Sequence, residues 1–279
     1  MPQPQTDILE KKLEKLRQII ADCGSALIAF SGGVDSTFLL KMAVEVLGDR
    51  ALAVTARSET YPEREYREAV RLAAEVGARH ITIASKELEI EQFVNNPPRR
   101  CYFCKKELFT KLTEVAREQG IERIADGCNA DDVDDFRPGM EAASEMGVIS
   151  PLKEAGLTKE DIRTLSKRMG VSTWDKPSLA CLASRFPYGK KITPEGLEMV
   201  ARAEDFLRDL GFRQLRVRHH GDMARIEVPK KDIPTLIEEE TRRKVVEGFR
   251  EIGYNYVTID LAGYRTGSMN IGFERRGKG

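Results

Sequence analysis

Several features that would assign the chain to a broad class are missing from its sequence. No apolar run approaches the ~20 residues that a membrane-spanning helix needs, and residues 1–12 lack the apolar core of a signal peptide. Charge of one sign is not in excess either, since 45 basic residues balance 45 acidic ones. Proteins that bind nucleic acid constitutively usually carry a basic excess. The sequence therefore predicts a cytoplasmic protein without membrane association, and it argues against nucleic acid as a partner.

Cysteine is also scarce. The chain has five, an odd number in a sequence without an export signal, which argues against a framework of disulfides. For any clustered pair of cysteines, metal binding or thiol chemistry is then the better interpretation. One such pair is present, as Cys101-x-x-Cys104.

Short apolar runs alternate with helical stretches through the first two thirds of the chain. Strands are expected at residues 26–30, 51–54, 80–83 and 123–125, and helices at 7–22, 38–47, 61–76 and 101–119. This alternation of strands and helices is typical of βαβ units. It predicts an α/β fold in which a parallel sheet carries helices on both faces.

The pattern changes at residues 186–191, a stretch of proline, glycine and lysine that reads as a linker or loop. We therefore expect one domain over 1–185 and a smaller one over 186–279. The smaller domain should contain helices at 195–210 and 231–252 and strands at 214–218, 224–228 and 256–259. The first two of these strands flank a Gly-containing turn, as in a hairpin. Their order predicts an α+β domain with an antiparallel sheet.

A glycine-rich loop separates the first predicted strand from the helix after it, with the sequence Ser31-Gly32-Gly33-Val34-Asp35-Ser36. The glycines let the backbone turn sharply and approach an anion, and the helix N-terminus offers unpaired N–H groups to a phosphate. The Ser31 and Ser36 hydroxyls can donate to phosphate oxygens, and Asp35 can hold Mg²⁺. The Walker pattern is absent. The string instead resembles the signature of the PP-loop superfamily, whose members cleave ATP between its α and β phosphates.

A second loop, Asp-Gly-Cys-Asn-Ala-Asp-Asp at 126–132, follows a later predicted strand. Alone it reads as an Asx-rich turn, just as the first loop alone reads as a plain Ser/Gly turn. The PP-loop superfamily places a similar loop near the nucleotide, so the two loops together predict ATP binding. The resemblance implies nucleotide contacts from Gly127, Asn129 and Asp131 in this loop, and from Thr55, Ala56 and Arg57 at the end of the second strand.

The cysteines admit more than one interpretation. Cys101 and Cys104 open a predicted helix at positions i and i+3, so both sulfurs could reach one metal or cluster, and the helix N-terminus and adjacent arginines favour thiolates. A structural zinc ion is usually bound by four protein ligands. Together with Cys181, the pair matches a 4Fe–4S cluster with one iron left open for a sulfide; zinc, redox chemistry and unreactive thiols are the alternatives. Cys128 as a fourth ligand would close that site.

The combination of motifs resembles the LarE family, the ATP-dependent sulfurtransferases of nickel-pincer cofactor biosynthesis. The resemblance runs over nearly the whole chain and rests on residues 31–36, 100–109, 126–132, 180–189 and 267–270. It implies that ATP adenylates a carboxylate of pyridinium-3,5-biscarboxylic acid mononucleotide, after which sulfur displaces AMP to leave a thiocarboxylate. It also implies a homo-oligomer, and it leaves the source of the sulfur open.

The family uses two ways to carry sulfur. In one, a single cysteine gives up its own sulfur and the enzyme turns over once; in the other, three cysteines hold a 4Fe–4S cluster that can be recharged. The sacrificial position aligns here with Ala180, beside Cys181. The resemblance therefore implies the cluster mechanism, with Cys101, Cys104 and Cys181 as ligands.

Basic side chains are expected to hold the phosphate and the second carboxylate of the substrate. Ser184 and Arg185 follow Cys181 closely, and Arg216 and Arg218 alternate along a predicted strand, so both project to one face. Without the resemblance a solvated strand face is an equal interpretation of these two arginines; with it a phosphate clamp is favoured. Glu204 on the preceding helix is a further substrate-binding candidate.

Three rival functions remain from the sequence. A tRNA-thiolating PP-loop enzyme shares the loop and, in some cases, a three-cysteine cluster. An ammonia-dependent amidotransferase or synthetase of the same superfamily would have no use for Cys101 and Cys104. A nucleotide-sensing or iron–sulfur scaffold protein would bind ATP without releasing pyrophosphate.

Overall fold

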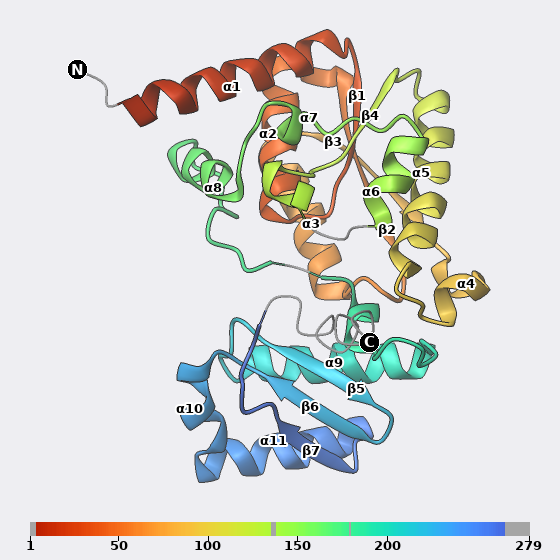
Figure 1. Ribbon diagram of the computed structural model, residues 1–279, viewed down its shortest axis with the longest axis vertical. Helices are drawn as coiled ribbons and strands as arrows, with labels where there is room; N and C mark the ends of the chain where they lie inside the picture. The colour runs from red at the N-terminus through yellow and green to blue at the C-terminus, as the bar shows by residue number, and fades with distance from the viewer. Residues whose placement is uncertain (1–3, 135–137, 179, 266–279) are drawn as a thin grey trace, which may run out of the picture. The chain divides into compact units, whose positions relative to one another are not determined.

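Figure 1 shows the chain as a computed structural model, which describes residues 4–134, 138–178 and 180–265. The chain divides into two compact units, one of residues 1–87 and 99–179 and the other of residues 88–98 and 180–279. In the described part of the chain no helix is both long and apolar enough to cross a membrane.

The second unit begins earlier than the sequence division at residue 186, and it includes 88–98, which that division gave to the first domain. Backbone hydrogen bonds explain the inclusion. The segment around α4 (Glu91–Val94) accepts bonds from Gly189 N to Asn96 O (3.0 Å) and from Ile192 N to Val94 O (2.9 Å). No local sequence pattern predicts hydrogen bonds between segments that lie almost 100 residues apart in the chain.

The first unit is built on the predicted parallel sheet, with strand order β3-β2-β1-β4 and every pair parallel. The α/β fold class is thereby confirmed. The strands are β1 (Ala26–Ala29), β2 (Ala51–Arg57), β3 (Arg79–Ala84) and β4 (Arg123–Ala125). The helices are α1 (Pro4–Asp22), α2 (Val34–Leu47), α3 (Glu63–Val76), α5 (Arg100–Glu118), α6 (Pro138–Glu145), α7 (Pro151–Glu154) and α8 (Lys159–Arg168).

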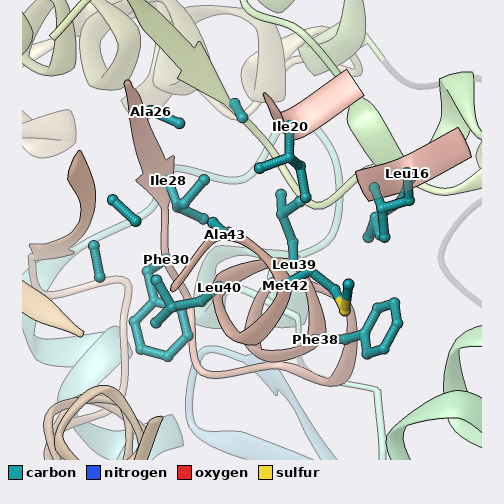
Figure 2. Packing of buried hydrophobic residues seen from close by; sticks show 14 of the residues in the cluster. Leu16, Ile20, Ala26, Ile28, Phe30, Phe38, Leu39, Leu40, Met42 and Ala43 are labelled. Atoms are coloured by element: carbon teal, nitrogen blue, oxygen red, sulfur yellow. The ribbon is translucent and has the colours of Figure 1, made fainter. Parts of the chain in front are cut away.

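Alternation along the strands places a helical layer on each face of this sheet. Ala26 and Ile28 point to the face covered by α1 and α2, where they pack in one apolar cluster (Figure 2). Leu27 points to the other face and packs with residues of α5 and α6 in a second cluster. Cys23, just after α1, is buried in the first cluster as a small apolar residue.

The second unit carries α9 (Pro194–Asp209), α10 (Ile233–Ile237) and α11 (Glu239–Ile252) beside a sheet of order β5-β6-β7. The strands are β5 (Arg216–His220), β6 (Met223–Glu227) and β7 (Tyr256–Ile259). The predicted hairpin of β5 and β6 is confirmed by their antiparallel register.

Two expectations for this unit were wrong. The sheet is mixed, because β7 pairs in parallel with β6 across a helical connection. The single helix expected at 231–252 is two helices, since Glu238 has an extended backbone (φ −52°, ψ 140°) that ends α10 and starts α11.

Candidate active site

The first glycine-rich loop joins β1 to the N-terminus of α2 and can adopt its shape only with glycine at position 32. Gly32 has φ +61°, and a Cβ built there would lie 3.0 Å from the Cβ of Ala69 and 3.1 Å from its Cα. The Ser31 and Ser36 hydroxyl oxygens lie 3.1 Å apart, and Ser36 Oγ donates to the Gly33 carbonyl. The loop therefore presents two hydroxyls and a helix N-terminus at one place, an arrangement suited to binding phosphate.

The structure brings the second loop against this one. A Cβ built on Gly127 would lie 3.0 Å from the backbone nitrogen of Ser36, so glycine allows the two backbones to approach. Asn129 Nδ2 lies 3.4 Å from Asp35 Oδ1, and the Asp131 amide donates to Asn129 Oδ1 at 2.9 Å. The sequence predicts that both loops belong to one nucleotide site, and the structure brings them together at Asp35 and Asn129.

Lys159, the first residue of α8, is a candidate that the sequence analysis missed. Its Nζ lies 2.5 Å from Asp35 Oδ2, and its backbone N–H donates to Asp131 Oδ2 at 2.8 Å. The one sequence signal nearby, the capping box between Thr158 and Asp161, marks a helix start and no ligand. The lysine adds a cation beside the glycine-rich loop, and the Asp35 carboxylate offers the oxygen ligands that Mg²⁺ prefers.

The end of β2 extends past β1, whose register ends at Ala29 beside Val54, and pairs with β3. Thr55 is buried, and its hydroxyl donates to the Phe30 carbonyl at 3.0 Å. His80 Nε2 lies 2.9 Å from the Thr55 hydroxyl oxygen. Arg57 is exposed and pairs with Glu63 at 2.9 Å. Ala56 is half-buried between them. Contact of these residues with adenine stays a prediction.

Cys101 and Cys104 lie in the first turn of α5, where Cys101 is exposed and Cys104 half-buried. The thiol of Cys104 lies 3.7 Å from Glu87 Oε1, a buried carboxylate that sequence analysis did not single out. Cys181 is exposed and belongs to the second unit. In the described parts of the chain, no three or more His, Cys, Asp and Glu side chains are grouped to hold a metal ion. The three-cysteine cluster stays a prediction.

Cys128 differs from those three thiols. It is partly buried, and its Sγ donates to Asp126 Oδ2 at 3.1 Å. Burial, together with the neighbouring Asp126 charge, raises the pKa of the Cys128 thiol to about 12. A raised pKa disfavours the thiolate, which is the form of cysteine that binds a metal.

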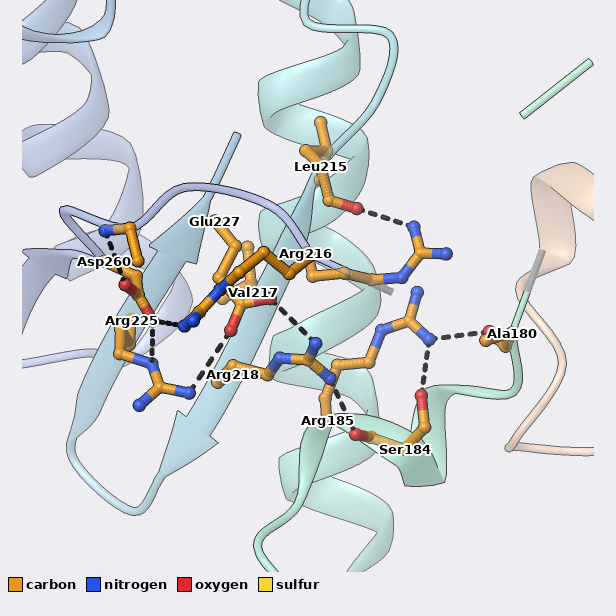
Figure 3. Close-up of polar contacts among 12 residues, drawn as sticks. Ala180, Ser184, Arg185, Leu215, Arg216, Val217, Arg218, Arg225, Glu227 and Asp260 are labelled. Atoms are coloured by element: carbon orange, nitrogen blue, oxygen red, sulfur yellow. Dashed lines mark hydrogen bonds and ion pairs between the residues drawn. The ribbon is translucent and has the colours of Figure 1, made fainter. Parts of the chain in front are cut away.

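In the second unit, Arg185 ties the segment around Cys181 to helix α9 (Figure 3). Its Nε and Nη2 donate to the two Glu204 oxygens at 2.8 and 2.9 Å, and its Nη1 donates to the Ala180 carbonyl at 2.7 Å and the Cys181 carbonyl at 2.9 Å. Arg185 Nη1 also lies 2.9 Å from the hydroxyl oxygen of Ser184. Arg185 is only 2 % exposed. Its hydrogen bonds to the Ala180 and Cys181 carbonyls hold the Cys181 loop, a role beyond the substrate binding that the sequence predicts.

The charge of Glu204 is stabilised by its arginine partners. Burial alone would raise the pKa of this carboxyl, but Arg185, with Arg216 and Arg208, lowers it to about 2. Glu204 also accepts the backbone N–H of Val217 at 3.1 Å. Substrate binding by Glu204 stays a prediction. Because the Glu204 side chain is fully buried, its contribution would be to position Arg185.

Arg216 and Arg218 on β5 are both buried, so the solvated strand face is wrong. Arg218 donates to Glu227 at 2.7 Å and to the Ser184 carbonyl at 2.9 Å (Figure 3). Arg216 donates to the Leu215 carbonyl at 2.7 Å, and its guanidinium lies 5.3 Å from the centre of the Tyr264 ring. Burial, and then the charge of Arg185, lower the pKa of Arg216.

Comparisons with known proteins show the family to which the chain belongs. The NAD synthase family matches residues 7–113, which span the glycine-rich loop. The chain is 39% identical over 263 residues to the pyridinium-3,5-bisthiocarboxylic acid mononucleotide synthase of Lactiplantibacillus plantarum, covering 94% of this chain and 95% of that one. The chain belongs to the LarE family. As a LarE-family member it is an ATP-dependent sulfurtransferase with a PP-loop domain.

Two further relatives show how much of the chain is shared with other proteins. An uncharacterized protein of Synechocystis is 44% identical over 94% of this chain and 98% of its own length. The tRNA-specific 2-thiouridylase of Rickettsia africae is 27% identical over 54% of this chain and 51% of its own. The LarE likeness thus includes the second unit. The motif at 267–270, part of the resemblance seen in the sequence, lies outside the described residues.

Proposed function

We propose that this chain adenylates a carboxylate of pyridinium-3,5-biscarboxylic acid mononucleotide and then replaces the AMP with sulfur. In the first step a carboxylate oxygen attacks the α-phosphorus of ATP, and pyrophosphate leaves. In the second, sulfide attacks the acyl carbon, and AMP leaves with that oxygen. The product is a thiocarboxylate. The observation that carries the proposal is the full-length likeness to a synthase of the corresponding bisthiocarboxylic acid.

The first unit supplies the groups for the first step. The helix α2 N-terminus and the hydroxyls of Ser31 and Ser36 hold the departing pyrophosphate, and Lys159 supplies a cation beside it. Asp35 would hold Mg²⁺, which would neutralise further charge on the phosphates. Substrate-dependent exchange of labelled pyrophosphate into ATP tests this step. Exchange is expected only when the biscarboxylate substrate is present, and its absence with that substrate would reject adenylation.

Replacing Lys159 by methionine is expected to lower this exchange about 100-fold, because a cation beside the departing pyrophosphate is lost. Lys159→Arg should retain most of the rate. The matched control is Lys15→Met, an exposed lysine on α1 of the same unit. Equal rates for Lys159→Met and Lys15→Met would place Lys159 outside the reaction.

The second unit supplies an anion site. In the described part of the chain, the guanidinium groups of Arg185, Arg216 and Arg218 are gathered there with Glu204 and Glu227. The substrate carries a phosphate and a second carboxylate, and planar guanidinium groups bind both kinds of group well. We assign substrate binding to these arginines together with Ser184.

The thiols of Cys101, Cys104 and Cys181 fit a 4Fe–4S cluster by their chemistry, since all three are at least partly exposed and thiolates are the usual ligands of such clusters. When bound there with one iron open, the cluster would supply the sulfide. The chain's own contribution is to hold the Cys181 loop through Arg185.

Anaerobic reconstitution with iron and sulfide tests the cluster. The wild-type chain is expected to bind iron and acid-labile sulfide in equal amounts, and Cys101→Ser should lose most of both. Cys128→Ser is the matched control, because the Cys128 thiol is protonated and bound to Asp126. Iron loss in Cys128→Ser equal to that in Cys101→Ser would contradict the assignment.

Two rivals predict different results. A tRNA-thiolating enzyme would bind bulk tRNA on a filter at physiological salt, and the likeness to the thiouridylase covers only about half of the chain. An ammonia-dependent ligase would be indifferent to Cys101→Ser and would form an amide when ammonia replaces sulfide.

A further inference from the structure

Two side chains on the side of α3 bind the carbonyl oxygens of the glycine-rich loop. The Tyr61 hydroxyl lies 2.8 Å from the Ser31 carbonyl oxygen and donates to it. The Lys176 ammonium donates to the Gly32 carbonyl oxygen at 3.1 Å. Both carbonyls belong to the turn that faces phosphate in the proposed function, yet neither side chain was indicated by a motif.

Ion pairs hold the Lys176 side chain in place. Its Nζ also lies 2.9 Å from Glu65 Oε2 and 2.7 Å from Glu68 Oε2, both on α3, and its side chain is 11 % exposed. Arg163 on α8 donates to the Trp174 carbonyl at 2.6 Å and to the Lys176 carbonyl at 2.8 Å, which holds the backbone on either side of Asp175. Gly32 itself packs on Ala69, one turn further along α3. The loop is thus held at α3 by the approach of Gly32 to Ala69 and by two hydrogen bonds. One bond comes from Tyr61, just before the helix, and the other from Lys176, which is bound to the helix through Glu65 and Glu68.

These bonds determine where the loop's N–H groups point. In a planar trans peptide the carbonyl and the following N–H point in opposite directions. Binding the Ser31 carbonyl on the α3 side therefore directs the Gly32 N–H to the other side, and binding the Gly32 carbonyl does the same for the Gly33 N–H. A carbonyl oxygen turned toward a phosphate would repel it, whereas an N–H stabilises it.

We propose that Tyr61 and Lys176 are positioning residues that hold the loop in its phosphate-binding conformation without touching the nucleotide. The inference rests on the proposed binding of ATP at this loop. It assigns to Lys176 a role that its two carboxylate partners alone would not require, because a purely structural ion pair needs no contact with the Gly32 carbonyl.

Equilibrium binding of two ligands to the whole chain tests the inference. The probes are α,β-methylene-ATP with Mg²⁺, which cannot be cleaved at the reacting bond, and adenosine, which has no phosphate. Lys176→Met should weaken α,β-methylene-ATP binding about 10- to 100-fold, and Tyr61→Phe about 3- to 10-fold, since each loses a hydrogen bond that orients the loop. Adenosine affinity should stay within about twofold of wild type in both.

Two further variants complete the test. Lys176→Arg should restore α,β-methylene-ATP binding to within about threefold of wild type, because guanidinium can still donate to the carbonyl and the carboxylates. Lys15→Met should bind both ligands as wild type does. Tyr61→Phe removes only a hydroxyl, so it stays informative if Lys176→Met, which strands the buried Glu65, fails to fold.

Three results would overturn the inference. In the first, Lys176→Met and Tyr61→Phe bind α,β-methylene-ATP as tightly as wild type. In the second, they lose adenosine and α,β-methylene-ATP equally, which is the signature of general unfolding. Both leave the proposed function standing. In the third, the wild-type chain itself fails to bind α,β-methylene-ATP, and the proposed function fails with the inference.

Discussion

Replacing Gly32 by alanine is expected to reduce substrate-dependent pyrophosphate–ATP exchange by about 100-fold or more, the effect of misplacing reacting groups by about 1 Å. The new Cβ would lie 3.0 Å from Ala69 Cβ and 3.1 Å from Ala69 Cα, so backbone must move. A shift of the loop away from α3 would change the direction of the N–H groups that are proposed to bind phosphate.

Gly48→Ala is the matched control. Gly48 also has a positive φ, +59°, but a Cβ there would meet nothing within 4 Å. Both variants carry the strain of a left-handed alanine, and only Gly32→Ala adds the collision with α3. Equal exchange rates in the two variants would show that the position of the loop against α3 does not govern adenylation.

The largest effect on stability is expected from Glu204→Gln. This change leaves the Arg185 guanidinium, 2 % exposed, without its charged partner. Breaking a buried ion pair by removing one partner costs about 3–5 kcal/mol, so the free energy of unfolding in denaturant should fall by about that amount. Glu198→Gln, an exposed change on the same helix, should alter it by less than about 0.5 kcal/mol.

The same carboxylate gives stability a pH dependence of known sign. The pKa of Glu204 is about 2 in the folded chain against an ordinary value of 4.5. Its contribution is therefore complete above about pH 4.5 and is lost as the pH falls toward about 2, because the unfolded chain binds the proton first. Glu204→Gln should lack this part of the acid transition. A variant with an unchanged acid transition would show that the charge of Glu204 contributes little.

The sequence could predict the features that depend on local residue patterns and on strand topology. The two loops of the first unit each follow a strand, and the carboxyl ends of parallel strands share one edge of a sheet, so their meeting at Asp35 and Asn129 was predictable. The hairpin of β5 and β6 was equally local.

The residues that were missed come from far along the chain. Lys159 is 124 residues from Asp35, and Lys176 is 144 residues from Gly32. Their roles depend on where α8 and the segment after it pack, which no spacing or periodicity encodes. Burial of Arg216 was hidden for a similar reason, because its environment is formed by residues as distant as Arg185 and Tyr264.

The central claim, that ATP activation here drives sulfur onto a carboxylate, is tested most directly by the mass of the product. The reconstituted chain is incubated anaerobically with Mg²⁺, ATP, sulfide and pyridinium-3,5-biscarboxylic acid mononucleotide, and AMP is measured in the same sample. We expect a product in which sulfur has replaced oxygen, formed together with AMP. Release of AMP without any sulfur in the mononucleotide would contradict it.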